Sequence, residues 1–257
     1  MAIIPLLMTS RPPGLLASLG VLALLLFASG CAGKAIAPRA TPAPPSDETL
    51  RVGIVVLDDE IVLSGRLFGP ENQPLVILTH MRPNDQTAWF SYAEELADNG
   101  FAALTFDFRG YGESEGRQDF GKLDDDLRAV INYMRDQGRG QIFLIGASMG
   151  GTTSLVVAAQ EAVEGVAVIS PPAQFEGQDA LGAVPNVTAP KLFIASEDDT
   201  AARLSLDEML EVAAPPVDSQ VYTENAHGTD FFDPLRSQHA DDVRQRVLDF
   251  LQQYAER

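Results

Sequence analysis

The sequence predicts an α/β protein with a mostly parallel central sheet, helices on both faces and an antiparallel hairpin at the start of the folded part. Three observations support this prediction. From Leu50 onward β-rich and helical segments alternate, several β-rich segments are continuously apolar, and an acidic turn joins the first two. Continuously apolar strands are typical of parallel sheets covered on both faces. Alternation of strands and helices favours the crossover connections that build such a sheet.

The elements follow in chain order. Residues 51–57 and 61–68 are rich in β-branched residues and meet at Asp58 and Asp59, which predicts the hairpin. Apolar or β-branched runs predict further strands at 74–80, 101–108, 141–147, 165–170, 190–196 and 218–224. Helical periodicity, first-turn acids and glycine stops predict helices at 87–100, 122–138, 149–162, 201–213 and about 234–254. No internal repeat is evident.

The first thirty residues have the composition of an export signal. Arg11 is the only charge among residues 1–30, and an apolar run of about fifteen residues follows it before small residues. The run is short for a membrane span, which needs about twenty apolar residues. The segment ends in Ala28-Ser29-Gly30-Cys31, which resembles the bacterial lipoprotein processing box, in which the cysteine is lipidated. Alternatives are an ordinary cleaved signal and an uncleaved anchor.

These features divide the chain into three parts: a signal peptide (1–30), a lipidated Cys31 with a proline- and alanine-rich tether (31–47), and a folded domain (48–257). The predicted location is therefore the outer face of a bacterial membrane, periplasmic or at the cell surface, with a membrane contact through lipid on Cys31. A soluble secreted protein is the alternative.

Composition excludes several classes of function. The formal net charge of −18 argues against nucleic-acid binding, which needs a basic stripe. A single cysteine permits neither an intrachain disulfide nor a cysteine-based metal site. The three histidines lie far apart in the sequence without the spacing of paired metal ligands, so neither a metal nor another cofactor is expected.

Polar residues at the ends of predicted strands mark the candidate site, because ligands of open α/β sheets bind outside the carboxyl ends of the strands. They are His80, Asp107, Ser148, Asp199 and His227.

Ser148 is the candidate nucleophile. It lies in "GASMG", between a buried strand and a helix, where Gly146 and Gly150 permit a sharp turn. Such a turn exposes the hydroxyl beside a helix N-terminus, where N–H groups favour negative charge. The pattern alone is a weak signal, and the hydroxyl needs a base to become nucleophilic.

His227 is the predicted base, because it follows the last predicted strand in a loop beside a glycine. His239 is expected on the solvated surface of the C-terminal helix. His80 ends the third strand, where a lone histidine is usually structural. The acidic run "EDD" (197–199) offers the acid that orients the imidazole, between nucleophile and base in the chain.

With "GASMG", "DFRGYGES" (107–114), "SEDD" and "AHG" in this order, the chain resembles the α/β-hydrolases over residues 50–257. The resemblance implies a Ser-Asp-His triad of Ser148, Asp199 and His227. It favours Asp199 over Asp198, because Ser196 then aligns with the glycine of the family's usual G-x-x-D turn.

The same resemblance implies two backbone N–H donors for the oxyanion. One is Met149, directly after the nucleophile. The other comes from "HMRPND", where counting from His80 selects Arg82, with Met81 as the alternative. Glycine usually stands at the position of Met81 in the family.

Other prominent residues are predicted to be structural. Asp107 and Arg109 shape the loop beside the site, Trp89 and Tyr92 belong to the core, and Asp124 to Asp126 complement a helix N-terminus.

About twenty residues separate "VISPPAQ" from "PKLFIAS", where many family members insert a helical lid. The site is therefore expected to be open, as in compact members such as dienelactone hydrolases and small carboxylesterases. The predicted function is a serine hydrolase that cleaves small-molecule esters through an acyl-enzyme. Alternatives are a serine peptidase or thioesterase of the same fold, or a catalytically silent binding protein. The sequence does not predict the oligomeric state.

Overall fold

The computed structural model of the chain describes residues 50–56 and 59–255. The predictions for the signal peptide, Cys31 and the tether lie outside these residues. Among the helices that the structure describes, none combines the length and the apolar character needed to cross a membrane.

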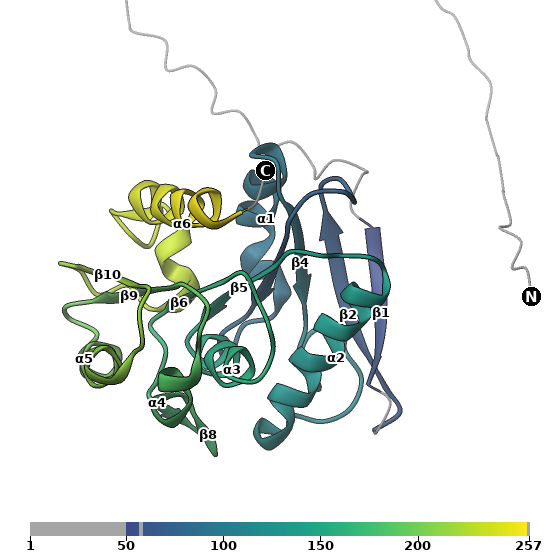
Figure 1. Cartoon of the computed structure of the whole chain (residues 1–257), viewed down its shortest axis with the longest axis horizontal. Coiled ribbons are helices and arrows are strands. Elements are labelled where there is room, and N and C mark those ends of the chain that lie inside the picture. The colour runs from purple at the N-terminus through teal and green to yellow at the C-terminus, as the bar shows by residue number, and fades with distance from the viewer. Residues whose placement is uncertain (1–49, 57–58, 256–257) are drawn as a thin grey trace, which may run out of the picture. The chain divides into compact units, whose positions relative to one another are not determined.

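A twisted central sheet organises the described residues (Figure 1). Its eight strands in the described part are β1 (Leu50–Val56), β2 (Ile61–Phe68), β3 (Leu75–Thr79), β4 (Ala102–Phe106), β5 (Ile142–Ala147), β6 (Gly165–Ile169), β9 (Lys191–Ser196) and β10 (Val217–Tyr222). Their spatial order is β1-β2-β4-β3-β5-β6-β9-β10. Strand β2 pairs antiparallel with β1 and β4, and the other pairs are parallel. The mostly parallel sheet with its opening hairpin is thus confirmed.

Helices cover both faces of the sheet, as predicted. Helices α1 (Phe90–Asp98) and α6 (Ala240–Tyr254) lie on one face, and α2 (Leu123–Asp136), α3 (Met149–Ala158), α4 (Ala180–Ala183) and α5 (Thr200–Val212) lie on the other (Figure 1). Side chains of alternate strand residues enter two separate apolar clusters, one on each face. Strands β3, β4, β5 and β6 are buried along their whole length, because both faces are covered.

Helix α3 lies between the sheet, α2 and α4. Every one of its residues except Val156 is buried. Its sequence explains this position, because small and apolar residues surround the whole helix and leave no polar face for water.

Two predicted helices have other boundaries in the structure. The final helix begins at Ala240 rather than near 234, since residues 228–232 form the 3₁₀ helix η4 and turns follow it. The predicted helix 87–100 is divided into a 3₁₀ turn, η1 (Gln86–Trp89), and α1. Asp85 caps that turn by accepting the backbone N–H of Thr87, which sets the start of the segment.

The short connection between β6 and β9 contains more structure than the sequence predicts. A small hairpin pairs β7 (Gln174–Phe175) with β8 (Gln178–Asp179), and α4 and the 3₁₀ helix η3 (Val184–Asn186) follow. Such short strands carry too little periodicity to be found in the sequence.

Candidate active site

Ser148 lies on a strained turn between β5 and α3. Its backbone adopts φ +48° and ψ −115°, a conformation that is costly for a residue with a side chain. Two glycines permit the turn. A Cβ on Gly146 would lie 2.5 Å from the carbonyl oxygen of Gly150, and a Cβ on Gly150 would lie 2.5 Å from that of Thr79. Glycine is therefore required on both sides of the serine.

Three side chains from separate loops form a continuous hydrogen-bonded series. The Oγ of Ser148 lies 2.8 Å from Nε2 of His227, and Nδ1 of His227 lies 2.5 Å from Oδ2 of Asp199. Ser148 follows β5, Asp199 follows β9, and His227 follows β10, so each stands at the carboxyl end of a parallel strand. The structure thus brings together the nucleophile, base and acid that the sequence suggests, in the relative positions of a serine-hydrolase triad.

Asp199 also serves as the N-cap of α5, where its other carboxylate oxygen accepts the N–H of Ala202 at 3.3 Å. That bond fixes the carboxylate relative to the helix and directs Oδ2 to the imidazole. Asp198 has a different environment, since its backbone N–H is bonded to the carbonyl of Glu224 and its side chain forms no hydrogen bond or ion pair with His227 among the described residues. The geometry therefore distinguishes the two acids as candidates.

Two buried serines fasten the loop that carries His227. Ser196, at the end of β9, donates its hydroxyl to the carbonyl oxygen of Ala226. Ser170, after β6, accepts the N–H of Gly228 at 3.2 Å. The histidine is thus held by its neighbours on both sides. The sequence used Ser196 only to align the acid turn and gave no sign of Ser170, because both bonds are tertiary contacts that no local motif indicates.

His80 is buried, and its ring forms no hydrogen bond with Ser148 among the described residues. Its Nε2 accepts the N–H of Phe108 at 3.1 Å, so the proton resides on Nδ1, which lies 3.0 Å from the carbonyl oxygen of Met81. Burial lowers the pKa of His80, which favours the neutral ring. This residue therefore holds the loop after β3 in place, as its structural interpretation implied.

The predicted oxyanion donors come from two different segments of the chain. Met149 is the first residue of α3, where backbone N–H groups have no partner within the helix. Met81 and Arg82 follow β3, and the elbow packs tightly against that strand end, since a Cβ on Gly150 would lie 2.7 Å from the carbonyl oxygen of His80. The roles of Met149 and of Arg82 or Met81 stay predictions.

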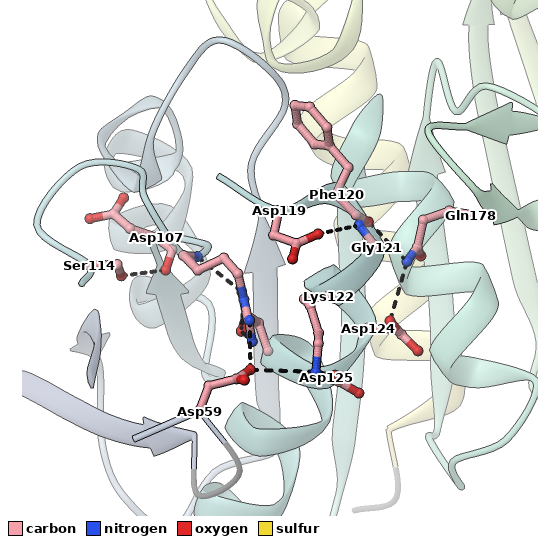
Figure 2. Close-up of polar contacts among 12 residues, drawn as sticks. Asp59, Asp107, Ser114, Asp119, Phe120, Gly121, Lys122, Asp124, Asp125 and Gln178 are labelled. Atoms are coloured by element: carbon pink, nitrogen blue, oxygen red, sulfur yellow. Dashed lines mark hydrogen bonds and ion pairs between the residues drawn. The ribbon is translucent and has the colours of Figure 1, made fainter. Parts of the chain in front are cut away.

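Asp107 supports the loop 107–114 rather than facing Ser148. Its carboxylate accepts the backbone N–H and the side-chain N–H of Gln86, both at 2.8 Å, and the N–H of Glu113 at 2.9 Å. Ser114 donates its hydroxyl to the carbonyl of the same aspartate at 2.5 Å (Figure 2). A scaffolding role, as predicted, accounts for these contacts.

Arg109 binds two carboxylates, and one of them was misjudged from the sequence. Its guanidinium bonds to Asp126 at 2.5–3.1 Å and to Asp59 at 2.7 Å. Lys122 approaches the same Asp59 carboxylate at 3.7 Å (Figure 2). Burial alone would lower the pKa of Arg109, but its bonds to the two carboxylates outweigh burial and raise it. Asp126 is therefore a buried ion-pair partner and more than a complement to the helix dipole.

The remaining candidates lie in structural positions. Trp89 and Tyr92 are fully buried against Phe232, so the prediction that they belong to the core is confirmed. His239 precedes α6 as its N-cap residue instead of lying inside the helix, and its half-buried ring packs on Tyr222.

Residues 70–221 match the family described as serine aminopeptidase, S33. Among curated proteins, the protein YfhR of Escherichia coli O157:H7 is 29% identical over 106 residues, which cover 39% of this chain and 37% of that protein. The protein Rv2307c of Mycobacterium tuberculosis is 27% identical over 207 residues, covering 69% of this chain and 73% of the relative. The chain thus spans well under half of YfhR.

Solved structures share the fold across most of the chain. The esterase Pf2001 of Pyrococcus furiosus superposes with a TM-score of 0.68 at 21% identity, covering 85% of this chain and 97% of that one. Est1E of Butyrivibrio proteoclasticus, solved with ferulic acid, gives 0.65 at 19% identity, with 79% and 98% covered. A proline iminopeptidase of Mycobacterium smegmatis gives 0.65 at 16% identity, with 80% and 98% covered.

Proposed function

Because the chain belongs to the serine aminopeptidase S33 family and has the α/β-hydrolase fold, we propose that it is an exported serine hydrolase that cleaves carboxylic esters. The family match and the fold make it a hydrolase. The ester specificity, the catalytic roles and the export are our proposals.

The observation that carries the proposal is the hydrogen-bonded series Ser148–His227–Asp199, at 2.8 and 2.5 Å. A serine hydroxyl becomes nucleophilic when a base within hydrogen-bond reach removes its proton. An imidazole keeps the required orientation when a carboxylate accepts its other N–H. A catalytically silent protein would need neither the strained serine nor this series.

In the proposed reaction, Ser148 Oγ attacks the ester carbonyl carbon while His227 Nε2 takes its proton. The carbonyl π bond opens to an oxyanion, which accepts hydrogen bonds from backbone N–H groups at Met149 and in the loop after β3. Collapse of this intermediate breaks the bond to the alcohol oxygen, and His227 returns the proton to that oxygen. Water then attacks the acyl-enzyme by the same steps and releases the acid. Asp199 stabilises the imidazolium in both halves.

Esters are the preferred substrates because several structures with the same fold, including those from Pyrococcus furiosus and Butyrivibrio proteoclasticus, are of esterases. The family description favours one alternative, an aminopeptidase. Hydrolysis of p-nitrophenyl butyrate compared with amino-acid p-nitroanilides separates the two. We expect hydrolysis of the ester and none of the anilides, and the opposite result would establish the peptidase.

The catalytic assignment is tested by Ser148→Ala, with Ser219→Ala on the exposed edge strand β10 as control. We expect Ser148→Ala to abolish labelling by a fluorophosphonate and to lower kcat by several orders of magnitude, because nucleophile and base act as a unit. The control should behave as wild type. Near wild-type hydrolysis by Ser148→Ala would refute the mechanism.

Export and lipidation rest on the signal-like segment 1–30 and on Cys31. Stable anchoring needs more than one acyl chain, since each buried CH₂ contributes about 0.8 kcal/mol. Cys31→Ser should release the protein from the membrane fraction or block its processing. If the wild-type protein is soluble and the mass of its mature form includes no acyl group, it is an ordinary secreted hydrolase and the proposed lipidation is wrong.

A further inference from the structure

Arg82 lies in the loop after β3, next to the candidate active site, and its cationic side chain extends toward Phe120 and Glu176. It follows Met81, whose sulfur packs so closely against the histidine loop that a Cβ on Gly228 would lie 2.5 Å from it. The preceding His80 packs against the elbow at Gly150. The backbone of Arg82 therefore follows directly on two residues that contact the nucleophile turn and the loop of the base.

The guanidinium of Arg82 is positioned but has unused hydrogen-bonding capacity. Its Cζ lies 5.2 Å from the ring centroid of Phe120, and Nη1 lies 3.9 Å from Oε1 of Glu176, too far for a hydrogen bond. The arginine and glutamate side chains are 52% and 53% exposed, so water screens the attraction between them and the pair is weak. Among the hydrogen bonds of the described residues, none has this guanidinium as donor. Its planar N–H groups can therefore donate hydrogen bonds to a bound anion.

The surface that holds Arg82 is well fastened. Phe175 packs edge-on against Phe120 with ring centroids 5.3 Å apart. Gln178 donates to the carbonyl of Phe120 at 3.4 Å and to Asp124 at 3.3 Å (Figure 2). These contacts tie the β7–β8 hairpin to η2 (Phe120–Lys122) and to the start of α2.

The hairpin turn explains why Glu176 faces outward at this place. Glu176 and Gly177 connect the two paired strands, with φ values of +47° and +95°. Positive φ at both central residues is the geometry of the tightest hairpins. The turn presents the glutamate at the tip, where its carboxylate approaches Arg82 without a direct hydrogen bond.

We infer that Arg82 binds a carboxylate carried by the ester substrate, so that the enzyme prefers half-esters of dicarboxylic acids or esters of hydroxy acids to neutral esters. This inference rests on the proposed ester hydrolysis. A substrate carboxylate can form two parallel bonds with the guanidinium, whereas Glu176 forms none. With a net charge of −18, the protein otherwise repels anions, so a substrate of this class needs a dedicated cation. Glu176 competes for Arg82 and weakens the preference.

The test compares anionic with neutral esters in the full-length protein. Mono-p-nitrophenyl glutarate against p-nitrophenyl butyrate places the carboxylate on the acyl side, and 4-acetoxybenzoate against phenyl acetate places it on the leaving group. The measured quantity is the ratio of kcat/KM, anionic over neutral, because this ratio cancels general effects on catalysis. We expect a preference for the anionic ester in one of the two pairs. That pair shows whether Arg82 binds a carboxylate on the acyl group or on the leaving group.

Three variants assign the preference. Arg82→Gln should lower the ratio tenfold or more, and Glu176→Gln should raise it about threefold or more, because it removes the competing carboxylate. The control Arg51→Gln removes a cation from a similar exposed pair, Arg51 and Glu113 at 3.7 Å, and should change the ratio less than twofold. If Arg51→Gln lowered the ratio as much as Arg82→Gln does, the preference would come from the overall charge of the protein, and the inference would be overturned.

A second measurement covers the case in which Arg82→Gln does not fold. Free glutarate should inhibit hydrolysis of p-nitrophenyl butyrate by the wild type more strongly than glutaramide does, and more strongly still in Glu176→Gln. Hydrolysis of neutral esters with an unchanged ratio in Arg82→Gln, or equal inhibition by the two compounds, overturns the inference alone. If no ester is hydrolysed, the proposed function fails and the inference fails with it.

Discussion

Gly146→Ala is the substitution whose consequence follows most directly from the structure. A Cβ at this position would lie 2.5 Å from the carbonyl oxygen of Gly150 and 2.7 Å from the Cα of Gly151. Both are backbone atoms of the helix that begins after Ser148, so no flexible side chain can move away. The strand and the helix must separate instead.

The size of the effect follows from the overlap. Contacts of this kind are not tolerated below 3.0 Å, so the backbone must shift by at least 3.0 − 2.5 = 0.5 Å. Overpacking of a close-packed interior costs about 1–3 kcal/mol, which lowers the melting temperature by about 2–12 °C in a domain of this size. A displacement of about 1 Å in a reacting group can lower the rate about a hundredfold. A displacement of about 0.5 Å should therefore lower kcat/KM by about tenfold.

The assay pairs thermal unfolding with hydrolysis of p-nitrophenyl butyrate. Gly140→Ala is the matched control, since a Cβ there meets no atom within 4 Å and the glycine does not have a positive φ. The control should keep the wild-type melting temperature and rate. Wild-type values for both quantities in Gly146→Ala would refute the claim that the elbow requires a glycine.

Three other predictions concern the acid, the histidine loop and the response to pH. Asp199→Asn should lower kcat far more than Asp198→Asn, because Asp199 bonds to the imidazole, and the reverse ranking would move the acid by one residue. Ser196→Ala should lower kcat with little change in KM, because it removes the hydrogen bond to the carbonyl oxygen of Ala226, next to the base. Ser196→Thr keeps a hydroxyl and should restore part of the loss. Equal rates for wild type and both variants would contradict this role. Burial lowers the pKa of His80, so the unfolded chain binds more protons there, and its contribution to stability is present above pH 6.5 and is lost as pH falls below it. Chemical denaturation between pH 7.5 and 5 should therefore show a steeper loss of unfolding free energy in wild type than in His80→Gln, and parallel curves would show that His80 contributes nothing to the slope.

The fold was predictable because the strongest signals in the sequence are local. The buried strands around β5 are uninterrupted apolar runs, and "GASMG" combines a strand end, two necessary glycines and a helix start in five residues. Three short motifs in a fixed order were enough to select Ser148, Asp199 and His227 as candidates. Their mutual distances could not be read from the chain, because they depend on which strands lie side by side.

The parts that escaped prediction depend on tertiary contacts. Asp126 resembled the other first-turn acids of α2, and only the approach of Arg109 from another loop makes it a buried partner. The bonds of Ser170 and Ser196 have no local pattern, since their hydroxyls bond to backbone groups of a loop far along the chain, although Ser196 itself lies in "SEDD". The β7–β8 hairpin is too short to give a periodic signal, yet it supplies Glu176 opposite Arg82.

Because α3 is buried on all sides, it should resist local unfolding more strongly than the loop that carries His227. Amide hydrogens of a helix buried on all sides exchange with solvent only when the whole domain opens, whereas loops on the surface open at much smaller free energies. Ser148 is attached to the enclosed helix, while His227 is attached to a loop held by two hydroxyl bonds. Under mild denaturing conditions the loop that carries His227 should therefore open, and separate His227 from Ser148, before helix α3 unfolds. Activity would then report on the loop, and global unfolding would report on the helix.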